Sequence, residues 1–377
     1  MPRPVLNAVT DHFRLEAELG GYEAAIAAAD AVEDAYRAVA ELVGARARNV
    51  AFTEHATSAF VAALSSIRFG AGDRIVATRA DYVSNHLQFI SLAERFGVEV
   101  VVAPDLPEGG VDPDALASIV HRQRPRLVTA THMPTSSGLV QDVAAVGRIC
   151  RARGVTYLVD ACQSVGQMPL DVGEIGCDFL SATARKFLRG PRGAGFLYVS
   201  DRVLDSGLHP LFPDLRGASW IAEDLYQPDP SARRFETWEF AWGLALGMGE
   251  AARYALDLGL DRISERVRAL SDRLRRMLAE LPGVRVLDRG AELSAIVTAS
   301  VEGREPRELA GALRRAGVNA TGQGRADALL DYDAKGVEGA LRLSPHCYNT
   351  VEELERTVAL LSELAGQART GFDLPQT

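Results

Sequence analysis

The stretch CDFLSATARKFLRGPRGAGFLYV (177–199) decides the fold class, because two short apolar runs flank a glycine-rich loop that contains Lys186. The chain has 41 lysines and arginines, and only Lys186 and Lys335 are lysines. Arginine replaces lysine easily on a surface, but its guanidinium does not deprotonate in proteins. We therefore interpret Lys186 as a candidate covalent catalyst. Lys335, in DYDAKG, fits an ordinary surface lysine.

Short apolar runs of the same kind recur outward from this stretch. Helix-like segments, such as 84–97 and 142–153, separate several of them. Strands that alternate with helices predict an α/β fold whose sheet is mostly parallel and covered on both faces. The predicted strands are NVAFT (49–53), RIVAT (74–78), VEVVVA (98–103), RLVTATH (126–132), TYLVDA (156–161), FLSAT (179–183) and AGFLYVS (194–200).

The rest of the chain predicts a second, smaller unit. Apolar periodicity indicates helices at 4–18, 23–43, 243–281 and 306–316, whereas 206–240 is irregular and predicts long loops. The runs VRVLDR, ELSAIVTASV, VNAT and GALRLSP predict a small α+β domain. Thr350 and Glu353 have capping-box spacing and open a last helix that Gly366 ends. We assign residues 20–260 to a large α/β domain. Residues 1–19 and 261–366 are assigned to a small α+β domain, and residues 367–377 to a disordered tail.

Composition excludes several classes of protein. A net charge of −9 argues against nucleic acid or an anionic membrane as the main partner. No apolar run reaches the roughly 18 residues that a membrane span needs, and the start MPRPVLNAVTDHF lacks a signal-peptide pattern. The four cysteines show no CxxC spacing: Cys150, Cys162, Cys177 and Cys347. We therefore expect reduced thiols, no metal site and a cytoplasmic protein.

Several reactive side chains follow predicted strands. Ligands of open α/β sheets bind outside the carboxyl ends of the strands. Asp160 stands at one such end, and Lys186 follows another. In AFTEHATSAF (51–60) a strand leads into a helix whose N-terminus, with the Thr57 hydroxyl, would suit a phosphate.

An amine, a buried acid and a phosphate cradle are what pyridoxal phosphate (PLP) requires. The lysine would hold the aldehyde as a Schiff base, and the acid would keep the ring nitrogen protonated. A nucleotide P-loop is disfavoured, because GxxxxGK[ST] is absent and Lys186 precedes the glycines of GPRGAG (190–195). A non-catalytic scaffold would have little need of Lys186, Asp160, Gln163 and Arg342 together.

The segments VDACQSVGQMPLDV (159–172) and 177–199 resemble the class V aminotransferase group of fold-type I PLP enzymes. This group includes cysteine desulfurases, selenocysteine lyases, isopenicillin-N epimerase and hercynylcysteine sulfoxide lyase. The resemblance extends from about residue 4 to about residue 365. It implies the fold-type I architecture, PLP as the cofactor, and a homodimer with active sites at the interface.

The resemblance also implies roles for single residues. Lys186 would bind the cofactor, and Asp160 would contact the pyridine nitrogen. Gln163 would contact the ring hydroxyl, and Tyr82 would stack on the ring unless it is a core residue. The phosphate would be held by Ala56, Thr57, Thr183 and Arg185. The substrate carboxylate would be held by Arg342, as a bidentate pair, and by Asn349, for which a helix cap is the alternative.

The chain also departs from the family pattern. Cysteine desulfurases carry a sulfur-accepting cysteine in a mobile loop, whereas the matching segment GVNATGQGRADALLDYDAKG (317–336) has none, and Cys347 lies elsewhere. Thr135 stands where desulfurases have an asparagine. Trp238 and Glu239 replace a Gly-Thr pair that reaches the phosphate from the second subunit. The family has a short strand before the segment in which this chain begins, so we expect a misplaced or truncated start.

The choice of reaction rests on these differences. SATARKFLRGPRG (181–193) and LEAELGGYEAA (15–25) look closer to the sulfoxide lyase branch than to desulfurases. Together with the missing cysteine, they favour a carbon–sulfur lyase that acts on a small amino acid, either cysteine or a cysteine S-conjugate, and releases pyruvate and ammonia. Transamination and epimerisation are the alternatives within the family, and a persulfide-forming desulfurase is less favoured. The 206–240 region and the GGYEAA loop are the expected dimer contacts.

Overall fold

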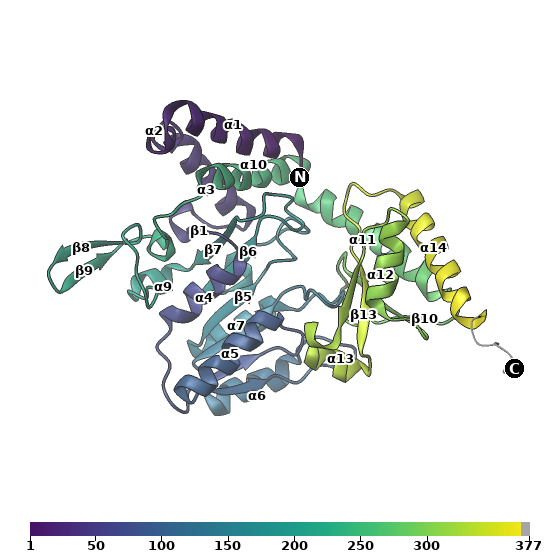
Figure 1. Cartoon of the computed structure of the whole chain (residues 1–377). Helices are drawn as coiled ribbons and strands as arrows, with labels where there is room; N and C mark the ends of the chain where they lie inside the picture. Colours follow the sequence, from purple (N-terminus) through teal and green to yellow (C-terminus); the bar gives the residue numbers. More distant parts are fainter. Residues whose placement is uncertain (371–377) are drawn as a thin grey trace, which may run out of the picture.

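The computed structural model of the chain describes residues 1–370, with the side chains of residues 1–366 (Figure 1). Its centre is a seven-stranded sheet of order β1-β7-β6-β5-β4-β2-β3. All neighbouring strands are parallel except β7, which is antiparallel to both β6 and β1. The mostly parallel sheet predicted from the sequence is therefore confirmed. Its strands are β1 (Val50–Thr53), β2 (Arg74–Ala77), β3 (Glu99–Val102), β4 (Leu127–Thr131), β5 (Thr156–Asp160), β6 (Phe179–Thr183) and β7 (Gly195–Val199).

Helices cover both faces of this sheet, as expected for strands that are apolar on both sides. In β5, Tyr157 and Val159 face one apolar core and Leu158 faces the other. The helices on the first face are α3 (Ala29–Leu42), α6 (Pro113–Gln123), α7 (Val143–Arg153), α8 (Val172–Ile175) and α10 (Trp242–Leu258). Those on the second face are α4 (Ala56–Ser66), α5 (Val83–Phe96) and α9 (Asp201–Asp205).

A second sheet of four antiparallel strands lies beside the first (Figure 1), in the order β10-β11-β13-β12. Three helices share an apolar core with it. The strands are β10 (Val284–Val286), β11 (Val297–Val301), β12 (Thr321–Gly324) and β13 (Gly339–Leu343), and the helices are α11 (Leu260–Ala279), α12 (Pro306–Arg315) and α14 (Val351–Thr370).

Two predicted helices are each interrupted. The segment 23–43 forms α2 (Gly21–Ala27) and α3, and the segment 243–281 forms α10 and α11. Gly259 separates the second pair with φ of +84°, a left-handed conformation that ends a helix and that glycine adopts without steric cost. The region 206–240 is not loops throughout, since it contains a hairpin of β8 (Ala218–Ala222) and β9 (Leu225–Pro228) and the 3₁₀ turn η2 (Ala232–Phe235).

The last helix begins as predicted and ends later. Glu353 N donates to Thr350 Oγ1 at 3.3 Å, and Thr350 N donates to Glu353 Oε2 at 3.0 Å, which is the capping box. The helix passes Gly366 and reaches Thr370, because a glycine in a helix costs only about 1 kcal/mol. The remainder of the predicted tail, 371–377, lies outside the described residues. Among the described helices, none is long and apolar enough to cross a membrane.

The domain boundaries stay a prediction, although one part of them meets a difficulty. Helix α1 (Arg3–Leu19) lies along α10 (Figure 1), and a side chain at Gly247 would meet Val9 Cγ2 at 2.4 Å. This packing argues against placing residues 1–19 with the small domain.

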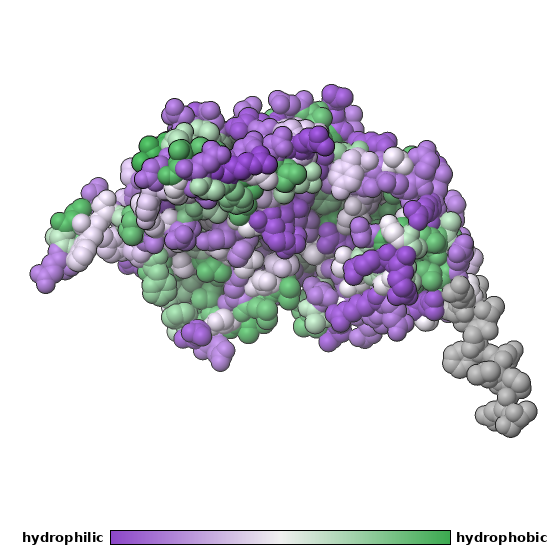
Figure 2. Space-filling model, turned by 45° about the horizontal axis from the view of Figure 1, so that its top comes forward, coloured by the Kyte–Doolittle hydropathy of each residue, from purple (hydrophilic) through white to green (hydrophobic). Residues whose placement is uncertain are grey.

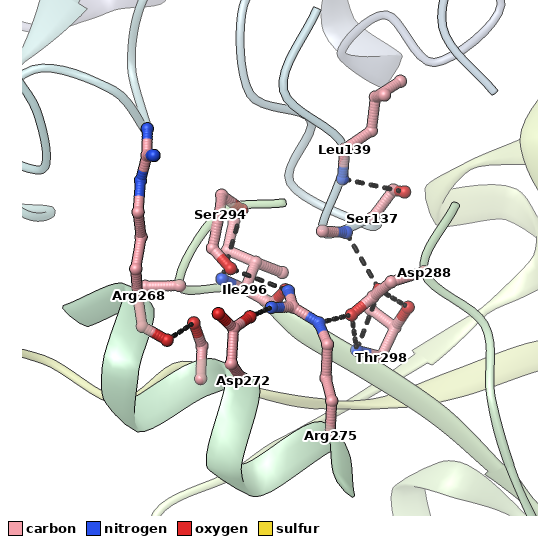
Figure 3. Close-up of polar contacts among 12 residues, drawn as sticks. Ser137, Leu139, Arg268, Asp272, Arg275, Asp288, Ser294, Ile296 and Thr298 are labelled. Carbon is pink, nitrogen blue, oxygen red and sulfur yellow. Dashed lines mark hydrogen bonds and ion pairs between the residues drawn. The ribbon is translucent and has the colours of Figure 1, made fainter. Parts of the chain in front are cut away.

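A buried ion pair stands at the boundary of the two sheets (Figure 3). Arg275 of α11 donates from Nε to Asp288 Oδ2 at 2.9 Å. Its terminal nitrogen also donates to the carbonyl oxygens of Ser294 and Ile296, both at 2.7 Å. The Asp288 side chain is fully buried, so its charge depends on Arg275 for compensation.

The same carboxylate fastens a loop of the large sheet. Asp288 Oδ1 accepts hydrogen bonds from Gly138 N at 2.9 Å and from Thr298 Oγ1 at 2.5 Å. Ser294 N donates in turn to Gly138 O at 2.6 Å. The loop that follows β4 is thereby joined to the strands of the small sheet.

We predict that Arg275→Ala lowers the free energy of unfolding by about 3–5 kcal/mol, because it leaves a carboxylate buried without its cation. Urea denaturation followed by circular dichroism measures the loss. Arg273→Ala on the same helix is the control, because its pair with half-exposed Glu355 contributes less than about 1 kcal/mol. Equal losses in the two variants would contradict the prediction.

Candidate active site

The carboxyl ends of five strands meet at one edge of the large sheet, because β1, β2, β4, β5 and β6 all run in the same direction. Side chains that follow these strands therefore come together, although they are far apart in sequence. They are His55 to Thr57 after β1, Tyr82 after β2, Thr135 after β4, Asp160 at the end of β5, and Thr183 to Lys186 at the end of β6.

A cavity of about 400 Å³ opens at this edge. Of the eight side chains predicted to contact a cofactor, all but Gln163 line it: Ala56, Thr57, Tyr82, Asp160, Thr183, Arg185 and Lys186. His55, Asn85, Cys162, Arg192 and Gly193 complete the lining. The structure thus brings together the groups that the sequence placed at separate strand ends.

Gly195 explains the glycine-rich loop beside the lysine. It pairs with Thr53 of β1 and with Thr183 of β6. A Cβ at this position would lie 2.7 Å from Ala182 O and 2.9 Å from His55 Cα. Only glycine lets β1 and β6 close around β7 here, and the start of α4 is thereby held beside the end of β6.

The Lys186 amine lies 5.8 Å from the centroid of the Tyr82 ring. No ion pair or hydrogen bond engages it among the residues that the structure describes. The loop of Lys186 is held by His346, whose Nε2 lies 3.0 Å from Phe187 O and whose ring stacks on Phe187 at 5.3 Å. The sequence analysis missed His346, and its only signal was the neighbouring Arg342 in ALRLSPHCYNT.

Asp160 is a buried carboxylate close to this amine. Its Oδ1 accepts from Cys162 N at 2.9 Å, and its Oδ2 lies 3.4 Å from Asn85 Nδ2. Burial raises the pKa of the Asp160 carboxyl above its ordinary value, and the charge of Lys186 opposes that rise. A cationic ligand group beside Asp160 would therefore be stabilised.

A second buried carboxylate, Asp81, positions the aromatic ring and was missed by the sequence analysis. Asp81 accepts hydrogen bonds from Thr131 Oγ1 at 2.5 Å, from Asn85 Nδ2 at 2.9 Å and from Tyr82 N at 2.8 Å. Asn85 bridges Asp81 and Asp160. The i, i+4 spacing of Asp81 and Asn85 at a helix start was the available signal.

Gln163 lies behind the cavity lining. Its Nε2 donates to Thr135 Oγ1 at 2.6 Å, so the threonine that replaces the family's asparagine holds this side chain. Gln163 Oε1 is buried without a hydrogen-bond partner in the described part of the chain. A buried acceptor of this kind calls for a donor from a ligand, which suits the predicted contact with a ring hydroxyl.

The start of α4 has the properties of an anion site. His55 Nδ1 caps the helix by accepting from Ser58 N at 3.0 Å, which is a structural role. The backbone N–H groups of Ala56 and Thr57 are left for a ligand, because the first turn of a helix has no internal acceptors. Arg185 is exposed and, within residues 1–366, forms no ion pair.

The two predicted substrate residues differ. Arg342 of β13 is half-buried, and the described structure contains no carboxylate in an ion pair with it. Burial, assisted by the charge of Arg185, lowers the pKa of the Arg342 guanidinium to about 10, so it stays cationic at neutral pH. Asn349 instead donates to Glu353 Oε2 at 2.8 Å and accepts from His346 N at 2.8 Å. These bonds fasten the turn before α14, but the cap of that helix is Thr350, so they do not support the helix-cap alternative for Asn349.

Lys335 is not an ordinary surface residue. Its side chain is only 6% exposed, pairs with Asp331 at 2.7 Å, and donates to Ser137 Oγ at 3.2 Å. The expectation from sequence was wrong, because α13 (Leu329–Lys335) packs against the loop that follows β4. The pairing leaves Lys186 as the lysine with a free amine among the described residues.

Comparisons with known proteins agree with this geometry. The profile of the family described as aminotransferase class-V matches residues 1–357. A probable cysteine desulfurase of Methanothermobacter thermautotrophicus is 30% identical over 97% of this chain and 92% of its own length. The structure of apo cysteine desulfurase from Thermococcus onnurineus NA1 superposes with a TM-score of 0.88, is 27% identical, and is matched over 97% of this chain and 92% of that one.

The chain belongs to the aminotransferase class-V family of PLP-dependent enzymes. The fold does not select one reaction, since a cystine C–S lyase, C-DES, solved with its product cysteine persulfide, also superposes with a TM-score of 0.86. That lyase is 22% identical over 96% of this chain and 94% of its own. The residues present fit PLP: an unpaired lysine amine, a buried carboxylate and an anion site line one cavity, and a buried amide oxygen without a partner lies behind that lining.

We predict that Asp160→Asn weakens PLP binding by about 10- to 150-fold, because a hydrogen bond to a charged group contributes roughly 1.5–3 kcal/mol. Titration of the apo-enzyme with PLP, followed by visible absorbance, measures the affinity. Asp171→Asn, which changes an exposed cap of α8, is the control and is expected to bind PLP normally. Unchanged affinity in Asp160→Asn would refute the assigned contact.

Proposed function

We propose that the protein is a carbon–sulfur lyase that removes the sulfur substituent of cysteine or a cysteine S-conjugate by β-elimination. The observation that carries the proposal is the cavity shared by Lys186 and Asp160, with the unpaired Arg342 close to Arg185 at its border. The segment 317–336 contains no cysteine to accept sulfur. The relatives named as probable cysteine desulfurases support cysteine chemistry.

The residues have distinct tasks in this proposal. Arg342 binds the substrate carboxylate as a bidentate pair, and Tyr82 and Gln163 orient the cofactor. When bound, PLP supplies a ring that withdraws electrons from the substrate Cα. The Lys186 amine takes the proton from Cα as a general base, and Asp160 holds a proton at the ring nitrogen.

The overall reaction balances without an oxidant or a reductant. The Cα–H bond and the Cβ–S bond break, and the sulfur leaves with its electron pair and takes up a proton as a thiol. The remaining enamine takes up water and gives pyruvate and ammonia. One water is consumed for each S-conjugate cleaved.

Desulfuration of cysteine is the second candidate, and the names of the relatives favour it. It would give alanine and would need a thiol to accept the sulfur. Cys347 is the half-buried cysteine nearest to Arg342 in sequence, and its Sγ lies 3.2 Å from His346 Nδ1. Transamination and epimerisation would use the same residues and would give a keto acid without sulfur release, or the other enantiomer of the substrate.

We predict that the holoenzyme releases pyruvate and a thiol in equal amounts from cysteine S-conjugates, measured by coupled lactate dehydrogenase and by thiol titration. Lys186→Ala is expected to lose both the activity and the visible absorbance of the lysine-bound cofactor. Lys335→Ala is the control, because it removes the other lysine of the chain and should keep that absorbance.

The products separate the candidates. Alanine instead of pyruvate from cysteine, abolished by Cys347→Ser, would establish a desulfurase that uses this thiol. A pyridoxamine form of the cofactor would indicate an aminotransferase, and a scrambled Cα configuration an epimerase. Each of these results, without pyruvate, would refute the lyase.

We also propose a homodimer, for which the exposed apolar side chains of the 206–240 region provide a contact surface. The protruding β8–β9 hairpin carries hydrophobic residues beside hydrophilic ones (Figure 2). Phe212 is 84% exposed, Trp220 79% and Trp238 50%. An apolar surface on a projecting arm is typical of a subunit contact.

We predict that Trp220→Asp shifts the protein from dimer towards monomer, because a charge is placed in an apolar interface. Mass photometry across a dilution series measures the dissociation constant. Glu223→Asp, at the turn of the same hairpin, is the control and should leave the constant unchanged. A monomer in the unmodified protein would contradict the proposal.

A further inference from the structure

A second cavity of about 280 Å³ shares Tyr82 with the cavity that contains Lys186 and Thr183. Its walls are mostly apolar. Leu87 and Ile90 of α5 contribute one wall, and Leu329 and Leu330 of α13 contribute the other. Both helices are labelled in Figure 1. Nothing described so far gives this cavity a role.

Two side chains connect this cavity to the site of chemistry. Tyr82, whose ring lies 5.8 Å from the Lys186 amine, lines both cavities. Thr135 lines the second cavity and accepts the hydrogen bond of Gln163. Because Tyr82 lines both cavities, the second cavity adjoins the one that contains Lys186.

The α13 wall is connected to β13, the strand that carries Arg342, which is the residue proposed to bind the substrate carboxylate. Thr321 of β12, which leads into this wall, pairs with Arg342 of β13. Tyr332 OH donates to Gln323 Oε1 at 3.0 Å, and Gln323 Nε2 donates to Ser136 Oγ at 2.9 Å. These bonds hold the wall against the loop that bears Thr135. The position of Arg342 relative to the second cavity is therefore fixed.

The lining decides which ligand fits. Its accessible surface is dominated by apolar atoms, and burial of a methylene there contributes about 0.8 kcal/mol. A second polar group at this position would lose its water without a matching partner. The one buried polar atom in the lining without a partner among the described residues is His86 Nε2.

We propose that this cavity is the subsite for the side chain of the substrate beyond Cβ, and that it selects cysteine conjugates with an apolar alkyl or aryl group on sulfur. The inference rests on the proposed lyase function, because it assumes that the leaving group is a thiol. The substrates would then be S-alkyl and S-aryl conjugates of cysteine. Free cysteine would leave the cavity unused and would be the poorer substrate.

The test uses amino acids that cannot undergo elimination of a thiol. The holoenzyme is titrated with alanine, norvaline and norleucine, and the change in cofactor absorbance gives each dissociation constant. Affinity is expected to rise about fourfold for each added methylene, which corresponds to about 0.8 kcal/mol. An equal affinity for all three amino acids would overturn the proposal.

Two variants locate the effect. Ile90→Asn and Leu329→Asn alter opposite walls at positions that are 59% and 45% exposed, so both should fold, and both should reduce the gain per methylene. Leu19→Asn, 52% exposed at the end of α1, is the control that should preserve it. A full gain in both wall variants would overturn the subsite.

Subsite and reaction can fail separately. If affinity rises with chain length and the wall variants reduce that rise, but no S-conjugate gives pyruvate, the subsite is supported and the lyase is refuted. Pyruvate from S-conjugates, with rates independent of the size of the substituent and no chain-length gain, would keep the lyase and refute the subsite.

Discussion

The parallel alignment of β2, β4, β5 and β6 is the constraint on which the rest of this structure depends. Because parallel strands share one carboxyl edge, each crossover returns the chain to the same place, and Tyr82, Thr135, Asp160 and Lys186 arrive there from distant parts of the sequence. β7 runs against this direction, and Gly195 lets its neighbours close around it. The cavity follows from these two facts.

Several charged and polar groups at this edge of the sheet lack partners, and bound PLP and substrate would supply them. Asp160 is buried without a cation in contact, Gln163 keeps a buried free acceptor, and Arg342 and Arg185 lack carboxylate partners in the described chain. Asp160 and Gln163 are buried, and such groups are costly without a partner in a low-dielectric interior. Elsewhere the buried carboxylates of Asp178, Glu236 and Asp288 each pair with an arginine. The unpaired set is therefore concentrated where a ligand would bind.

The small sheet carries Arg342, the proposed substrate contact, and it also holds the loops of the large sheet beside the site in place. Asp288 fastens the loop after β4, His346 contacts the backbone next to Lys186, and Lys335 donates to Ser137. Three separate contacts thus set the distance between Arg342 of β13 and the amine of the large sheet. Helices α13 and α5 line opposite walls of the apolar cavity, so its shape depends on how the two sheets meet.

The sequence by itself determined the strand–helix alternation, and it gave Lys186 as the candidate catalyst and a set of candidate cofactor contacts. Apolar periodicity and strand-end residues are local properties, and an amine in a chain that otherwise uses arginine stands out in composition alone. Only the tertiary structure decided that Lys335 is buried, that the Asn349 side chain contacts Glu353, and that Asp81, Asn85 and His346 support the site. Three of the contacts involved, Lys335 to Ser137, Asn85 to Asp160 and His346 to Phe187, join residues 75 to 198 positions apart, which no local pattern in the sequence specifies.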